Sequence, residues 1–296
     1  MATRLKQLFR DVYKRQILTL LTGLATDGII VIGMTMILVI GMIDLSVGSI
    51  MGMVCMIVAM LTKAGINVWL GSLIAFIIGC LCGVINGLLI GKYSLNSFIT
   101  TFAMQSILAG VTLLSTQGRS ISPKSDTPSY AAFQFIGQGK IAMIPAIVLV
   151  LLVFIAIGDF LLRRVAKFRE LYYIGSNPKA AAVSGLNVQK TIIAVYILSA
   201  ALASIAGVLS LSRCGASTPT TGVDAPMNAI SAAVIGGASL NGGVGTIFGA
   251  FLGVILINII DNGLILMNVS VYGRDLISGL LLLVAIIADR ISNRKK

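Results

Sequence analysis

Residues 40–52 read IGMIDLSVGSIMG and place an aspartate and two serines inside one of the most apolar parts of the chain. The flanking segments 28–39 and 50–61 contain only apolar residues, glycine and threonine. A carboxylate at the centre of a bilayer costs roughly 3 kcal/mol on insertion scales. If this stretch lies in a membrane, Asp44 must be capped, paired, protonated, or close to an interface or a water-filled path.

Composition places the stretch in a membrane. The chain is 57% hydrophobic and only 11% charged, far from the balance of a soluble domain. Continuous apolar runs predict helices, because lipid forces every backbone polar group to be satisfied internally, and the alternation of a membrane barrel is absent. We therefore expect an all-α, polytopic transmembrane bundle of about nine spans. The predicted spans are 17–41, 42–62, 68–91, 96–116, 141–162, 191–212, 222–241, 244–267 and 274–289.

The distribution of charge predicts how the bundle is oriented in the membrane. The formal net charge is +12, and three clusters hold all of the excess: residues 1–16, residues 163–190 and the tail from 289. Basic excess in short loops marks the cytoplasmic side of a membrane protein. We expect 1–16 to be a separate basic segment and 17–296 a single transmembrane domain with a cytoplasmic loop at 163–190. Nucleic-acid binding is not expected, because no basic stripe carries interleaved aromatic residues.

Several chemistries are missing from the sequence. There is no histidine, which removes Ser-His-Asp triads and most zinc or haem sites. There is no GxxxxGK[ST] motif for nucleotide hydrolysis, and the four cysteines show no CxxC spacing, as expected for buried small hydrophobes. We predict no catalytic residue, no metal and no cofactor, and favour a transporter or channel.

Glycines predict two further features. The residues spaced four apart, which predict flat faces for close helix packing, are Gly79, Gly83, Gly87 and Gly91 in one strip and Gly245, Gly249 and Gly253 in a second. "VGSIMG" at 47–52 is echoed by "VGTIFG" at 244–249, each after a polar, turn-prone segment. We therefore expect broken or re-entrant segments near 40–48 and 236–245. Asp44 and Ser46 then either cap the following helix or contact a solute.

Five ordered motifs carry a family resemblance. They are "GMIDLSVGS", "INGLLIGKYSLNSFITTFAM", "QGRSI", "IGSNPKAAAVSGLNVQKT" and "AISAAVIGGASLNGGVGTIFGAFLG". Together they resemble the membrane-spanning permease subunit of bacterial ABC sugar importers, the ribose/xylose/galactoside-type branch. The resemblance implies a multi-pass protein of the bacterial cytoplasmic (inner) membrane that works as a homodimer or heterodimer of permease subunits. It also implies two further partners, a cytoplasmic ABC ATPase and an extracytoplasmic sugar-binding protein.

The resemblance assigns roles to two groups of residues. The segment "SNPKAAAVSG" resembles the family's coupling segment, and the residues predicted to contact the ATPase are Asn177, Pro178, Ala180, Ala181, Ala182 and Gly185. An ordinary capped loop helix, with Ser176 or Asn177 as the cap, fits the same residues. The candidates for the pathway of a ribose-like pentose or related monosaccharide are Asp44, Ser46, Ser239 and Asn241.

One alternative function and one irregularity stay open. Broken helices also build ion-coupled secondary transporters or channels, in which Asp27, Asp44 and Asp261 would be the coupling carboxylates. Five predicted crossings separate residues 1–16 from the 163–190 loop, which puts the two basic clusters on opposite sides. Because family members usually carry one more span ahead of residues 17–41, we expect a missing first span and a non-native segment at 1–16.

Overall fold

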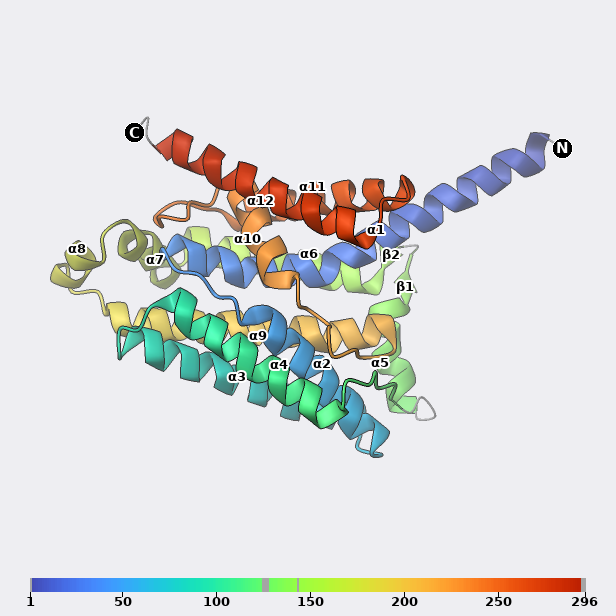
Figure 1. Ribbon diagram of the computed structural model, residues 1–296, viewed down its shortest axis with the longest axis horizontal. Coiled ribbons are helices and arrows are strands. Elements are labelled where there is room, and N and C mark those ends of the chain that lie inside the picture. Colours follow the sequence, from blue (N-terminus) through green and yellow to red (C-terminus); the bar gives the residue numbers. More distant parts are fainter. Residues whose placement is uncertain (1, 124–127, 143, 294–296) are drawn as a thin grey trace.

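The structure, a computed structural model, is a bundle of long helices that run roughly side by side (Figure 1). It describes residues 2–123, 128–142 and 144–293. The helices are α1 (Ala2–Val39), α2 (Val47–Lys63), α3 (Val68–Gly91), α4 (Ser97–Thr116), α5 (Pro128–Gln138), α6 (Ala146–Arg164), α7 (Ala166–Ser176), α8 (Pro178–Val183), α9 (Val188–Cys214), α10 (Ala225–Ile235), α11 (Ile247–Leu266) and α12 (Val271–Asn293). Two short strands, β1 (Lys140–Ile141) and β2 (Ile144–Pro145), pair antiparallel ahead of α6.

The all-α, polytopic prediction is confirmed. Within the described residues, six helical stretches are long and apolar enough to cross a bilayer, and they are Leu18–Val39 of α1 together with α3, α4, α6, α9 and α11. Two predicted spans are shorter than expected. The span at 42–62 is the 17-residue α2, and the span at 222–241 is the 11-residue α10. Both are shortened because residues 40–46 and 236–246 are not helical.

Helix α9 lies at the centre of the bundle and contacts α1, α2, α3 and α5. The Leu18–Val39 stretch of the neighbouring α1 is also largely buried. By contrast, α3, α4 and α11 expose large apolar side chains such as Leu73, Phe102 and Leu252. This distribution is typical of a membrane bundle, in which the outer helices present apolar surface to lipid.

The first glycine strip lies against α9. It consists of Gly79, Gly83, Gly87 and Gly91, all buried on one face of α3. A Cβ on Gly83 would lie 2.8 Å from the carbonyl oxygen of Tyr196, and one on Gly87 would lie 2.9 Å from Cα of Ile193. Because backbone atoms occupy the space of a side chain, only glycine allows α3 and α9 to approach this closely.

The second strip is interrupted. Gly249 and Gly253 lie on α11 and contact the backbone of Gly236 and Ala232, so they let α10 and α11 pack closely. Gly245 lies outside the helix, because α11 begins after the cap residue Thr246, whose hydroxyl accepts the amide of Gly249 at 3.1 Å. The prediction of one continuous glycine face over residues 245–253 is therefore wrong, since Gly245 belongs to the broken segment.

The bundle has two distinct ends. Helices α7 and α8 form one end, on the left of Figure 1, and α5 with the β1–β2 pair lies at the other. The basic residues Arg163, Arg164, Lys179 and Lys190 lie in or beside α7 and α8. The described end of α12 lies towards the same side, whereas α1 starts at the opposite side. The basic residues of the 163–190 segment and the described end of α12 thus share the α7–α8 end.

Replacing Gly87 with leucine is expected to destabilise the bundle. The new side chain would meet the backbone of Ile193, and overpacking of this kind costs about 1–3 kcal/mol or more. The matched control is Gly110→Leu on α4, where a Cβ added to the glycine would have no atom of the described residues within 4 Å. Thermal unfolding in detergent, followed by size-exclusion chromatography, should show a lower midpoint for Gly87→Leu alone. Equal midpoints for the two variants would contradict the close α3–α9 contact.

Candidate solute pathway and coupling segment

Asp44 is the centre of a buried hydrogen-bond cluster at the break between α1 and α2. Its carboxyl group is 1% exposed and accepts the amide of Ser46 at 2.9 Å and the hydroxyl of Ser46 at 2.6 Å through Oδ1. Oδ2 accepts the hydroxyl of Ser199 on α9 at 3.3 Å. The side-chain amide of Asn86 on α3 donates to the Ser46 hydroxyl at 2.9 Å. The cluster therefore joins the break to α3 and α9.

The backbone of the same break is held by side chains of α4 and α9. Thr101 accepts the amide of Leu45 at 3.1 Å, and the Tyr196 hydroxyl donates to the carbonyl of Ile43 at 3.1 Å. Of the two predicted helix caps, Asp44 accepts an amide at the start of α2, but the Ser46 side chain makes no capping bond within the described part of the chain, because its hydroxyl donates to Asp44. Both side chains are enclosed by the bundle, so neither faces an open path here.

The second break, at 236–246, meets the first. The amide of Gly243 donates to the carbonyl of Val39 at 2.8 Å, directly joining the two segments. A Cβ on Gly41 would lie 3.4 Å from the carbonyl oxygen of Asn241. Ser239 is 4% exposed and accepts the amide of Asn241 at 3.2 Å, whereas Asn241 itself is exposed. The four predicted pathway residues thus belong to adjoining segments, although only Asn241 is open to a solute.

Helix α7 rests on this meeting point. Its Tyr172 hydroxyl donates to the carbonyl of Gly245 at 2.7 Å. A Cβ on Gly175 would lie 2.6 Å from the amide nitrogen of Gly243 and would also collide with the carbonyl oxygen of Val39. We call the region where Val39–Gly41, Gly175 and Gly242–Gly245 meet the junction. Glycine is required there because three backbone segments are in contact.

Helix α8 follows directly. The side chain of Asn177 accepts the amide of Ala180 at 3.0 Å, Pro178 stands in the first turn, and Gly185 follows the helix with φ +86°. Ala180 and Ala182 are exposed, but Ala181 is only 4% exposed because it faces its own chain. The outermost side chain is Val183, which is 91% exposed.

A hollow of about 460 Å³ lies beside α8 and is lined by residues such as Tyr173, Asn177 and Leu186. Its walls also include Ala180 and Ala181, two of the predicted coupling residues. The small residues and the hollow form a shallow surface at the end of the bundle, and Val183 projects from it.

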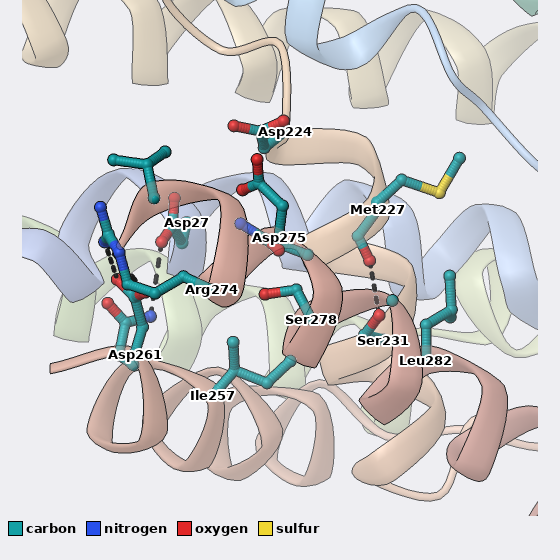
Figure 2. Close-up of a pocket in the computed structure, with 14 residues that line it drawn as sticks. Asp27, Asp224, Met227, Ser231, Ile257, Asp261, Arg274, Asp275, Ser278 and Leu282 are labelled. Carbon is teal, nitrogen blue, oxygen red and sulfur yellow. Dashed lines mark hydrogen bonds and ion pairs between the residues drawn. The ribbon is translucent and has the colours of Figure 1, made fainter. Parts of the chain in front are cut away.

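A second, polar cavity of about 500 Å³ lies between α1, α10, α11 and α12 (Figure 2). It includes Asp27 and Asp261, two of the carboxylates named for ion coupling, but not Asp44. Asp27 accepts the side-chain amide of Asn258 at 3.4 Å, and Arg274 pairs with Asp261 at 3.1 Å. Sequence reasoning did not find this cavity, because its polar residues are scattered over four helices and no local motif joins them.

Comparisons with known proteins agree with the fold. A family model described as the permease component of branched-chain amino acid transport systems matches residues 16–286. The ribose import permease protein of Haemophilus influenzae is 34% identical over 281 residues, covering 95% of this chain and 86% of that protein. The ribose import permease protein of Bacillus subtilis is 36% identical, covering 93% and 84%. The xylose transport system permease protein of Haemophilus influenzae is 32% identical, covering 95% and 90%. A comparison with solved structures gave no significant match.

These matches and the helical bundle define the class of the protein, a polytopic permease subunit of an ABC-type importer in the bacterial cytoplasmic membrane. The chain belongs to the family of permease components of branched-chain amino acid transport systems. The resemblance seen in the five sequence motifs is therefore confirmed.

Replacing Asp44 with alanine is expected to destabilise the break by about 3 kcal/mol, because it removes three accepted hydrogen bonds and leaves Ser46 and Ser199 buried without an acceptor. Asp44→Asn is the matched control, since it keeps the volume and one acceptor oxygen for Ser46, and it should cost less. Thermal unfolding in detergent measures both variants. The structural role of Asp44 would be refuted if the alanine variant were as stable as the unchanged protein.

Proposed function

We propose that the chain is the permease subunit of an importer for a ribose-like pentose or related monosaccharide, driven by a separate ATPase. The named relatives, two for ribose and one for xylose, support this choice, because each match covers more than four fifths of both chains. We further propose that the chain works in a pair of permease subunits. An extracytoplasmic sugar-binding protein delivers the solute.

The observation that carries the proposal is the contact between α7 and the junction. Two helix breaks within the membrane bundle meet at one point, and the helix that leads into α8 contacts both of them. A displacement of α7 and α8 therefore has a direct mechanical route to the 40–46 and 236–246 segments. Packed backbones transmit such a displacement well, because interiors are dense and have low compressibility.

The charge distribution supports an assignment of which end of the bundle faces the cytoplasm. Arg163, Arg164, Lys167 and Arg169 precede or belong to α7, and basic excess of this kind faces the cytoplasm. We assign the α7–α8 end to the cytoplasmic side, where an ATPase works. The α5 end then faces the binding protein.

The surface of α8 has the features of a docking site for that ATPase. Val183 is a large apolar side chain that is 91% exposed, and the exposed Ala180 and Ala182 leave room around it. A projecting apolar residue among small ones is suited to enter a groove of a partner, where it would act as an anchor. Ala181 contributes to the adjacent hollow instead, so we assign it to the support of α8 and not to the anchor.

The pathway assignment follows from burial. Asp44 and Ser46 hold the first break in place, while Asn241 at the junction is exposed and is the member of the predicted set that can meet a solute. The hydroxyl of Ser239 accepts the backbone amide of Asn241 and so positions this residue. We propose that the junction is the gate of the pathway on the cytoplasmic side.

The function is tested by uptake into proteoliposomes that hold the permease, its ATPase and its binding protein. We expect radiolabelled ribose or xylose to accumulate only with ATP on the ATPase side, and leucine not to accumulate. A matched preparation with a hydrolysis-deficient ATPase is the control. Uptake driven by an ion gradient without ATP would overturn the proposal in favour of an ion-coupled transporter, and accumulation of leucine alone would overturn the sugar assignment.

Coupling is tested at the tip of α8. Val183→Glu should lower retention of the ATPase by about tenfold or more, because a buried unpaired charge in a partner groove is strongly unfavourable. Tyr272→Glu is the matched control, since Tyr272 is 86% exposed in the first turn of α12, and α12 starts at the end of the bundle opposite α8. Pull-down of the ATPase and its sugar-stimulated hydrolysis provide the readouts. Retention of the ATPase by Val183→Glu at the level of Tyr272→Glu would remove α8 from the interface.

A further inference from the structure

We propose that the polar cavity between α1, α10, α11 and α12 is a solute-binding site within the permease, selective for neutral polyhydroxylated molecules and closed to anionic ones. This inference rests on the proposed function, because the side from which a solute enters the cavity follows from the orientation assigned above. The cavity is separate from the cluster around Asp44 and from the junction.

The lining of the cavity is unusually polar for a membrane bundle. Four aspartates contribute to it, Asp27, Asp224, Asp261 and Asp275, and they come from four different helices or their caps. Ionisable groups at membrane depth are rare, and they generally mark a water-filled cavity or a solute path. Asp27 and Asp261 lie within helices long and apolar enough to cross the membrane, and they share the cavity with Asp224 and Asp275, so the lining points to a hydrated site.

The cavity reaches from the end of the bundle towards its middle. Arg274 lies in the first turn of α12 and Asp275 directly follows that turn, and Asp224 precedes α10. Asp27 lies nearer the middle of the bundle. Roughly 18 Å of helix, at 1.5 Å per residue, separates it from Val39, where α1 ends at the junction. In the proposed orientation the mouth faces the binding protein. A solute released there would enter at Asp275 and pass inward towards Asp27.

The hydrogen-bonding groups suit hydroxyl ligands. Carboxylate oxygens accept hydroxyl protons, and the side chains of Asn228, Ser231 and Ser278 add further polar atoms along the wall. The Nε atom of Arg274 is buried and has no hydrogen-bond partner among the described residues. This donor provides one unused group for a ligand oxygen. The cavity volume of about 500 Å³ lies within the range of small-molecule sites.

The charges explain the selectivity. Arg274 is the one basic residue of the described lining, and its guanidinium already pairs with Asp261 at 3.1 Å. A sugar phosphate or a sugar acid would meet Asp224 and Asp275, with no other cation in that lining to balance them, whereas Asp27 has Arg213 nearby. A neutral sugar meets no such repulsion. This chemistry suits neutral sugars such as those in the names of the ribose and xylose relatives.

The test measures the electrostatics of the cavity and its occupancy without ATP or any partner, so that its failure is distinguishable from failure of the uptake assay. The accessible thiols Cys80 and Cys214 are first replaced by alanine, which leaves the buried Cys55 and Cys82 in place. Ser278→Cys then puts one reporter in the cavity wall, and Thr220→Cys puts a matched reporter on an exposed loop at the same end of the bundle. Each variant, in proteoliposomes, reacts with a trimethylammonium or a sulfonate methanethiosulfonate reagent.

We expect the cationic reagent to outpace the anionic one at Ser278→Cys by roughly tenfold more than at Thr220→Cys, because nearby carboxylates attract one reagent and repel the other. Adding Asp275→Asn should lower that ratio, and ribose at high concentration should slow labelling while ribose 5-phosphate does not. Size-exclusion chromatography checks that each variant is folded. Equal ratios of cationic to anionic labelling rates at Ser278→Cys and Thr220→Cys would overturn the proposed selectivity. Protection by ribose 5-phosphate would overturn the exclusion of anions, and protection by neither solute would overturn the binding site.

Discussion

Every backbone polar group within the membrane must find a partner inside the protein, and the two interrupted helices make this requirement acute. The amide of Gly243 and the carbonyl of Val39 satisfy one another across the two breaks. Side chains supply further partners: Thr101 and Tyr196 bind the first break, and Tyr172 binds the second. The positions of α4, α7 and α9 around the breaks follow from these bonds, because a misplaced helix would leave buried backbone groups unpaired.

Glycine makes the same arrangement sterically feasible. The α3 strip brings α3 against the backbone of α9, and α9 in turn carries Tyr196 and Ser199, which reach the first break. At the junction, Gly175 allows α7 to contact both breaks at once. Hydrogen bonding and close packing therefore converge on one rigid region at the α7–α8 end. The proposed function uses this region to transmit the movement of α8.

The two ends of the bundle differ in chemistry, which suits a directional transporter. The α7–α8 end combines basic residues, a projecting Val183 and tightly packed glycines. The opposite end holds an acidic cavity of about 500 Å³ whose lining includes Asp27. Rigid contact is required where mechanical movement enters the bundle. A polar, partly open wall is required where a hydrated solute enters, and the structure separates these two requirements along the helix axes.

The sequence alone determined that the protein lies in a membrane, and it determined the helical class, the family and the location of both breaks. Continuous apolar runs and clustered glycines are local signals. It also indicated the capped helix at Asn177–Gly185, since caps and turn residues act over a few positions. Only the tertiary structure decided that Asp44 and Ser46 are enclosed, that Ala181 faces inward and that Val183 projects. The meeting of residues 39–41 with 242–245, and the cavity that joins Asp27 to Asp261 and Arg274, depend on how distant helices pack. Helix periodicity shows which residues share a face, but not which other helix that face meets, and for that reason these contacts could not be predicted.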